Sequence, residues 1–281
     1  MGIDDGNHDE NALSPNWIPP GLDLDRASAA RMYDFYLGGS HHLAVDRDKA
    51  NEVLAVLPQA RTFALQNRAF LRRAVQYCLG QGIRQFLDLG AGLPTVGNVH
   101  ETAQAQIPDA RVVYVDNDPV AVAHGELLLE HNPYATYVDG DIAYPNEVLK
   151  AVDKTKLLDF SQPLMVLICA VLHFVPDTKR PARIVQRYSD ALAAGSYLAL
   201  THATASDYPE QLADVVEIYQ QTQNQAHLRS RSQITAMLDS FEHLVRPGLV
   251  YTPEWQPEHG INLGNPAESL AFAALAHHPR L

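Results

Sequence analysis

The sequence predicts an α/β fold in which helices cover both faces of a mostly parallel sheet. Two observations carry this prediction. Short apolar runs alternate with helical patterns after residue 83, and such alternation is typical of βαβ units. The runs are also apolar at nearly every position, as in Met-Val-Leu-Ile at residues 165–168. That pattern indicates strands buried on both faces, as in a parallel sheet.

The residues before the first strand are expected to form two regions. Residues 1–25 are acidic and contain few hydrophobic residues, so we expect a disordered tail. Residues 26–82 are expected to form an N-terminal helical cap. Its first helix begins near Ser28 and ends at Gly38 and Gly39, since glycine is a common helix stop. Two further helices are predicted at 46–57 and 59–79.

Residues 83–281 are expected to form the sheet domain, with seven strands. Five parallel strands are predicted at 84–88, 111–116, 136–139, 163–169 and 196–202. The helices that follow them are predicted at 95–106, 119–131, 145–152, 180–193 and 209–225. A helix from Arg231 to about Ser240 and a strand near 244–251 come next. Residues 269–278 fit a strand or a helix, and we interpret them as a reversed final strand.

The turn after the first strand is the most informative motif. Asp88 lies at the strand end, and Gly90, Ala91 and Gly92 precede a helical stretch that begins near Thr95. Glycines between a strand and a helix let a ligand approach the backbone closely, because no Cβ is in the way. A single glycine pair would also fit an ordinary tight turn.

Two further strand ends carry acidic residues. Asp116 and Asn117 follow the second strand, where an acidic side chain suits hydrogen bonding to the two hydroxyls of a ribose. Asp141 and Ile142 follow the third strand, where a carboxylate can accept a hydrogen bond from an adenine amino group. Either aspartate could instead cap a helix or a turn. The three strand ends together favour a nucleoside cofactor.

The glycine spacing distinguishes between such cofactors. A dinucleotide-binding turn needs a third glycine for close helix–strand packing beneath the pyrophosphate, but Thr95 stands at that position and Pro94 precedes it. Asp88 would repel a phosphate, whereas it suits the ammonium group of S-adenosylmethionine (SAM). The sequence therefore favours SAM over NAD, and a nicotinamide-dependent oxidoreductase is the less favoured alternative.

Four segments resemble the actinobacterial S-adenosyl methyltransferase family, formerly classed as a domain of unknown function. They are residues 30–39 (ARMYDFYLGG), 86–101 (FLDLGAGLPTVGNVHE), 114–119 (YVDNDP) and 170–177 (AVLHFVPD). The similarity runs from about Ala27 to about Trp255. It implies a Rossmann-like class I methyltransferase fold that binds SAM, and it implies no particular acceptor. Pro94 departs from the broader methyltransferase pattern, which has a third glycine there.

The resemblance also implies a role for the N-terminal segment. Tyr33, Gly38 and Gly39 match the family's Tyr-Asp…Leu-Gly-Gly segment, which we expect to close over SAM as a lid. An ordinary capping helix with an aromatic core residue is the alternative. The expected cofactor contacts are Tyr33, Gly38, Gly39, Asp88, Gly90, Ala91, Gly92, Thr95, Asp116, Asn117, Asp141, Ile142 and Ala170.

The acceptor is expected over the carboxyl ends of the strands, beside the sulfonium. His173 is the candidate general base, because an imidazole titrates near neutral pH. A hydrogen-bonded structural histidine fits this position equally well, and His202 is a weaker candidate of the same kind. Arg229 and Arg231 could bind an acidic acceptor, but a surface location is favoured for both.

Charge bears on the class of acceptor. The net charge is −12 and no basic run is present, which disfavours a nucleic acid. Arg68, Arg72 and Arg73 are interpreted as a solvated face of one helix. The expected acceptor is therefore a small molecule. A non-catalytic, regulatory SAM-binding protein is the alternative, because no unmistakable base is present.

A few residues bear on location and metal binding. Cys78 and Cys169 are expected to be reduced core thiols, as in a cytoplasmic protein. The longest apolar run, residues 164–172, is too short to cross a bilayer. The histidine pairs at 41–42 and 277–278 lack the spacing of metal ligands, so no metal site is expected. The sequence does not indicate an oligomeric state.

Overall fold

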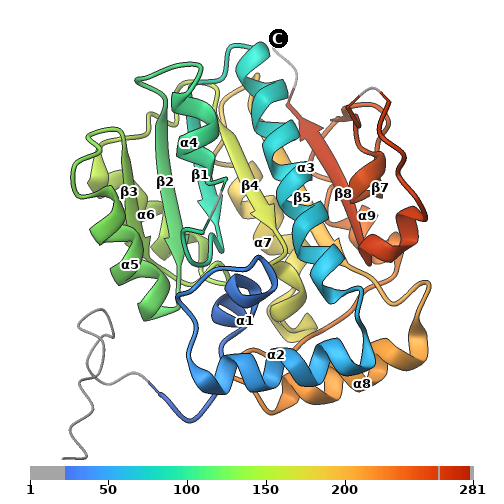
Figure 1. The fold of residues 1–281 in the computed structure, drawn as a ribbon. Coiled ribbons are helices and arrows are strands. Elements are labelled where there is room, and N and C mark those ends of the chain that lie inside the picture. Colours follow the sequence, from blue (N-terminus) through green and yellow to red (C-terminus); the bar gives the residue numbers. More distant parts are fainter. Residues whose placement is uncertain (1–22, 96, 259, 279–281) are drawn as a thin grey trace, which may run out of the picture.

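Five parallel strands form the centre of the sheet. The computed structural model describes residues 23–95, 97–258 and 260–278 (Figure 1). Every residue of the first and fourth strands is buried, because both faces of the sheet are covered. Each strand lies within two residues of its predicted position. The strands are β1 (Gln85–Leu89), β2 (Arg111–Asp116), β3 (Ala135–Asp139), β4 (Met165–Cys169) and β5 (Tyr197–Ala203).

The final strand runs against the others, as predicted. β8 (Ala271–His277) pairs antiparallel with β5 along its whole length. The strand order is β3-β2-β1-β4-β5-β8-β6, and β7 also pairs with β8. The predicted number of seven strands is wrong, because the described residues form eight. The strand expected near 244–251 is two strands, β6 (His243–Leu244) and β7 (Val250–Tyr251), separated by a turn in which the Gly248 amide donates to the Val245 carbonyl (2.9 Å).

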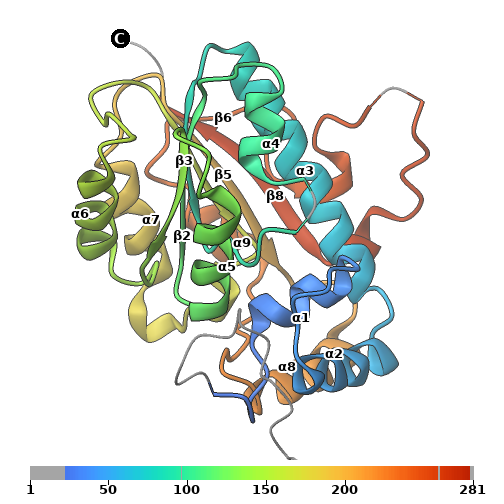
Figure 2. The same ribbon diagram turned by 60° about the vertical axis from the view of Figure 1, so that its left-hand side comes forward.

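Helices cover both faces of this sheet (Figure 2). One face packs against α3 (Ala60–Gly80), α4 (Val99–Gln104) and α5 (Pro119–Leu129). The other packs against α6 (Pro145–Thr155), α7 (Pro181–Ser189) and α9 (Arg231–Ala236). The helix expected at 95–106 begins later, at Val99, because the Glu101 side chain accepts the Asn98 amide proton (2.8 Å) and so caps the helix there.

A third group of helices lies at the carboxyl ends of the strands (Figure 1). It contains α1 (Ala29–Tyr36), α2 (Ala44–Val56), the first half of α3 and α8 (Pro209–Gln220), which share one apolar cluster. The second half of α3 instead packs on the sheet. The boundary at residue 82 between the helical cap and the sheet domain stays a prediction. The disordered acidic tail was expected at residues 1–25, and residues 1–22 of it lie outside the described residues. None of the described helices is long and apolar enough to span a membrane.

Gly125 of α5 lets this helix approach β3 closely. A Cβ at Gly125 would lie 2.2 Å from Cδ2 of Tyr137, whose ring stacks on Tyr114. We therefore expect Gly125→Ala to lower the free energy of unfolding by about 1–3 kcal/mol through overpacking, although alanine favours helix by about 1 kcal/mol. Urea unfolding measures the change.

Gly80→Ala is the matched control for this substitution. Gly80 is the last residue of α3, is exposed, and has no described atom within 4 Å of an added Cβ. We expect a change of less than about 0.5 kcal/mol. Equal effects of the two substitutions would contradict the packing explanation.

Candidate active site

A cavity of about 460 Å³ lies between the carboxyl ends of the strands and the helical group of α1, α2 and α8. Its volume is in the range of small-molecule sites. It brings together eleven of the predicted site residues: Tyr33, Asp88, Gly90, Ala91, Gly92, Asp116, Asn117, Asp141, Ile142, Ala170 and His173. Gly38, Gly39 and Thr95 are not among the described residues that line it.

The glycine turn exposes its backbone to this cavity. Gly90 (φ +72°) and Gly92 (φ +67°) both adopt the left-handed conformation that favours glycine. A Cβ at Gly90 would lie 2.4 Å from Cγ2 of Val171, whereas no described atom lies within 4 Å of a Cβ at Gly92. The turn is held in place because the Val115 carbonyl accepts the amides of Gly90 (2.8 Å) and Ala91 (3.1 Å).

Asp116 links this turn to the end of β2. Its Oδ2 accepts the Gly92 amide proton (2.7 Å) and its Oδ1 accepts that of Asp118 (2.8 Å). Burial raises the pKa of Asp116 to about 6, although these backbone hydrogen bonds lower it. A carboxylate oxygen can accept more than one hydrogen bond. Asp116 therefore keeps acceptor capacity toward the cavity.

Asp88 and Arg68 lie on the same polar side of the cavity. Asp88 is buried at the end of β1, and burial raises its pKa to about 7. The nearby Asp116 raises this pKa further, while Arg68 lowers it. The Arg68 guanidinium also lies over the Tyr33 ring, 5.9 Å from its centroid. Asp88 is therefore a carboxylate suited to a cationic ligand group.

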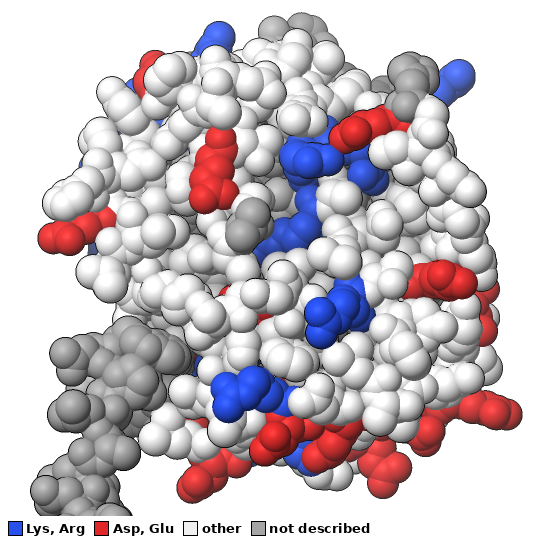
Figure 3. Space-filling model, in the orientation of Figure 1, with Lys and Arg blue, Asp and Glu red and all other residues white. Residues whose placement is uncertain are grey.

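The interpretation of Arg68, Arg72 and Arg73 as one solvated face is wrong. Arg68 lines the cavity, and Arg73 donates to the carbonyls of Trp255 (2.9 Å) and Thr252 (2.7 Å). Arg72 is exposed and pairs with Glu258. Figure 3 shows basic side chains in separate groups along the face formed by α3, with acidic side chains along the lower edge. Helical spacing alone could not show which of these arginines faces a cavity.

The end of β3 presents Asp141 and Ile142 to the cavity. The Asp141 Oδ1 accepts the Ala143 amide proton (2.8 Å), so this side chain does cap its own turn. Ile142 is buried, and its carbonyl accepts from the Tyr188 hydroxyl (3.3 Å). Asp141 can both cap its turn and bind a ligand, because it lines the cavity and its other oxygen remains an acceptor.

Gly39 and Thr95 lie against a buried carboxylate that sequence reasoning missed, and Gly38 precedes Gly39 in the same turn. Asp34 accepts hydrogen bonds from the Thr95 hydroxyl (3.1 Å) and the His41 amide (2.9 Å). A Cβ at Gly39 would lie 2.0 Å from the Asp34 Oδ1, so glycine leaves room for this carboxylate. These residues join the end of α1 to the glycine turn. Asp34 directly follows Tyr33, and that Tyr-Asp pair was the available signal.

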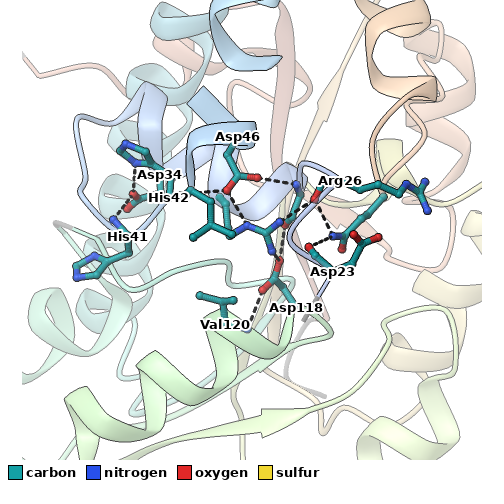
Figure 4. Close-up of polar contacts among 12 residues, drawn as sticks. Asp23, Arg26, Asp34, His41, His42, Asp46, Asp118 and Val120 are labelled. Carbon is teal, nitrogen blue, oxygen red and sulfur yellow. Dashed lines mark hydrogen bonds and ion pairs between the residues drawn. The ribbon is translucent and has the colours of Figure 1, made fainter. Parts of the chain in front are cut away.

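A second buried network joins the same helices to β2 (Figure 4). Arg31 is fully buried, and its guanidinium donates to Asp46 (2.8 Å) and Asp118 (3.2 Å). Asp118 also accepts from the Ser28 hydroxyl and from the Val120 amide (2.8 Å), which caps α5. The network therefore holds α1, α2 and the start of α5 together beside Asp116. Sequence reasoning missed it, because no local pattern marks an ion pair between distant helices.

His173 lies in a short 3-10 helix, η1 (Leu172–Phe174), directly after β4. It is buried, and its Nδ1 has no hydrogen-bond partner among the described residues. Burial lowers the pKa of His173 well below its usual value, and His202 and Arg229 lower it further. The imidazole is therefore neutral near pH 7, when it can accept a hydrogen bond but is a weak base.

The surface location expected for Arg229 is wrong, although Arg231 is exposed. Arg229 is buried and donates to Asp177 (2.7 Å) and to the carbonyls of Leu172 and Val175. Its Nη1 also lies 2.9 Å from Nε2 of His202, and burial lowers the pKa of that histidine to about 4. Arg229 thus supports the segment that carries His173.

Both cysteines are free and buried, and burial raises the pKa of each thiol. Cys169 lines the cavity at the end of β4. Within residues 23–95, 97–258 and 260–278, no group of three or more His, Cys, Asp and Glu side chains could hold a metal ion.

Comparison with known proteins identifies the family. A family model described as S-adenosyl methyltransferase matches residues 15–279. The chain belongs to this family. SAM is therefore the cofactor of this S-adenosyl methyltransferase, and the predicted preference for SAM over NAD is confirmed. The predicted resemblance and the class I methyltransferase fold are confirmed as well.

Two solved structures are similar to this S-adenosyl methyltransferase over nearly its whole length. A candidate methyltransferase from Thermobifida fusca is 36% identical, with a TM-score of 0.87 over 95% of this chain and 100% of that chain. A DUF574 family protein from Streptomyces avermitilis is 32% identical, with a TM-score of 0.84 over 92% of this chain and 100% of that chain. The CurJ carbon methyltransferase is 14% identical, with a TM-score of 0.51 over 82% of this chain and 61% of that chain, and shows the fold alone. No curated protein matches the chain.

Proposed function

We propose that this S-adenosyl methyltransferase transfers the methyl group of SAM to a small molecule in the cytoplasm. The observation that carries the proposal is the cavity, which joins three acidic strand ends to an apolar compartment within about 460 Å³. A cavity of this size suits a cofactor and a small acceptor better than a nucleic acid. The two free, buried cysteines support the cytoplasmic location.

The residues that line the polar side fit SAM. Asp116 keeps acceptor capacity for the ribose hydroxyls, with Asn117 beside it. Asp141 and Ile142 would hold the adenine. The methionine part would lie along the glycine turn, with its ammonium near Asp88. Tyr33, Ala91 and Ala170 line the same space and would complete the enclosure.

The remaining residues would orient the acceptor and exclude water. Bound SAM supplies an electrophilic methyl group on its sulfonium, and the protein mainly aligns the acceptor with it. The neutral His173 would accept a hydrogen bond from the acceptor rather than remove its proton. We also propose that α1 and the Gly38–Gly39 turn form the lid over SAM. Tyr33 lines the cavity, and Asp34 contacts Thr95 beside the glycine turn.

Calorimetric titration of SAM and NAD into the wild type and Asp116→Ala tests the cofactor site. We expect SAM to bind the wild type and NAD to bind far more weakly. Asp116→Ala should weaken SAM binding by about 1–3 kcal/mol, because ribose hydroxyls lose a buried acceptor. Since the pKa of Asp116 is raised to about 6, SAM affinity should also fall as the pH drops below 6 and the carboxylate becomes protonated.

Asp139→Ala is the control for this titration. Asp139 is an exposed aspartate at the end of β3 and does not line the cavity in the described part of the chain. It should leave SAM affinity unchanged. A wild type that fails to bind SAM, or that binds NAD more tightly, would overturn the proposed function.

A further inference from the structure

The cavity has a charged half and an uncharged half. The charged residues that line it are Arg68, Asp88, Asp116, Asp118, Asp141 and Lys179. The four aspartates lie at strand ends or in the turns that follow, Arg68 lies on α3 beside Tyr33, and Lys179 ends a short 3-10 helix, η2 (Asp177–Lys179). The lining residues of α2 and α8 are Val53, Leu212, Val215 and Tyr219, and none of these is charged. The described residues therefore separate a polar cofactor side from an apolar side.

Aromatic rings form a continuous wall along the apolar half. The Tyr33 and Phe63 rings meet edge to face, with centroids 6.4 Å apart, and Phe63 meets His173 in the same way at 6.0 Å. His173 lies against Phe174 (4.4 Å), which in turn contacts Tyr219 (5.6 Å). The wall combines α1, α3, η1 and α8, which lie far apart in the sequence. Such a wall suits a planar ring, since aromatic pairs favour edge-to-face and offset contacts.

One polar side chain in this wall has a ring nitrogen without a hydrogen-bond partner among the described residues. The Nδ1 of His173 is buried and has no hydrogen-bond partner among the described residues, and the residue lines the cavity. Leaving a buried polar atom unpaired is unfavourable. The low pKa of His173 keeps the imidazole neutral, so a ring nitrogen can act as an acceptor. A hydroxyl group on a bound molecule would donate to the imidazole of His173, which lines the cavity.

We propose that the methyl acceptor is an uncharged, apolar ring compound whose hydroxyl donates a hydrogen bond to the imidazole of His173. This inference rests on the proposed function and names its substrate class. A carboxylate or phosphate beside α2 and α8 would lose its hydration, and the lining residues of these two helices supply no cationic partner, so acceptors with such a group there are disfavoured.

Fluorescence titration with three naphthalene probes tests this inference. The protein is first saturated with S-adenosylhomocysteine (SAH), the demethylated product, and then titrated at pH 7.5 with 2-naphthol, 2-naphthoate or naphthalene. We expect 2-naphthol to bind at least about tenfold more tightly than the charged 2-naphthoate. It should also bind at least about threefold more tightly than naphthalene, which lacks the hydroxyl. These comparisons on the wild type require no variant to fold.

Two histidine variants assign the hydrogen bond. In His173→Leu the preference for 2-naphthol over naphthalene should disappear. His131→Leu is the matched control, because His131 is exposed and lies outside the described lining of the cavity. It should keep the wild-type preference. Thermal melting checks that both variants are folded.

Four results would decide against some part of the argument. Binding of 2-naphthoate as tightly as 2-naphthol would overturn the uncharged class. An unchanged preference in a folded His173→Leu would overturn the role of the His173 imidazole. Binding of SAH with no binding of any probe would overturn the acceptor compartment. A protein that binds no SAH but still prefers 2-naphthol would refute the proposed function while supporting the ligand class.

Discussion

Asp88→Asn is expected to stabilise the ligand-free protein at pH 8 and at the same time to weaken SAM binding. Burial raises the pKa of Asp88 from 3.8 to about 7, and each pKa unit corresponds to about 1.4 kcal/mol. The ionised carboxylate therefore lowers the free energy of unfolding by an amount on the order of 4 kcal/mol above pH 7. Asparagine removes the charge and keeps the shape, so it should recover most of this free energy.

The pH dependence has a definite sign. Because the folded-state pKa of Asp88 is raised, the folded protein binds more protons than the unfolded chain between about pH 4 and pH 7. The stability of the wild type should therefore fall as the pH rises through this range. The advantage of Asp88→Asn should be largest above pH 7 and should shrink as the pH falls toward 4. Urea unfolding of the ligand-free proteins at several pH values measures it.

The same substitution should weaken SAM binding at pH 8 by about 1.5–3 kcal/mol, because the ammonium group loses a charged partner. Asp139→Asn, at an exposed strand end, is the control and should change the free energy of unfolding by less than about 0.5 kcal/mol at every pH. If Asp88→Asn destabilised the protein at pH 8, the carboxylate would have to be compensated in the folded state, and our account of its burial would fail.

Arg31→Met is expected to be the most destabilising of the proposed substitutions. Arg31 is fully buried between Asp46 and Asp118, and methionine retains much of its apolar length but no charge. Removal of one partner leaves two buried carboxylates without their cation, and breaking a buried ion pair in this way costs about 3–5 kcal/mol. Urea unfolding measures the change.

Arg72→Met is the matched control for Arg31→Met. Arg72 pairs with Glu258 at 2.9 Å, but the side chains are 50% and 59% exposed. Water and salt screen such a pair, so the substitution should change the free energy of unfolding by about 0–1 kcal/mol. Similar losses for the two variants would show that the α1–α2 network does not depend on the buried charges.

The sheet could be predicted from the sequence because local patterns determine it. Strands buried on both faces are apolar at nearly every position, and the five parallel strands were placed on that basis. The single strand expected near 244–251 was wrong because a turn at Gly248 divides it, and a short apolar run does not reveal such a turn.

The site was predictable at the strand ends and less so on the helices. Asp88, Asp116 and Asp141 follow apolar runs, and parallel strands bring their carboxyl ends to one edge. The positions of Arg68 and Arg229 depend instead on how distant helices pack. Their charges indicated a solvent-exposed location, but Arg68 lines the cavity and Arg229 is buried. The Arg31 network has the same origin, because its three charged residues come from separate elements.

Asp118 contacts the proposed cofactor site and also belongs to the buried network of Arg31. Its amide donates to Asp116, while its carboxylate accepts from Arg31 and Ser28. A ligand that binds Asp116 is thus connected through Asp118 to the contacts that order α1 and α2. Equilibrium coupling of this kind is reciprocal. Looser packing of α1 and α2 would reduce cofactor affinity. A bound cofactor would in turn stabilise these two helices and slow their hydrogen exchange, and the coupling free energy is the same in both directions.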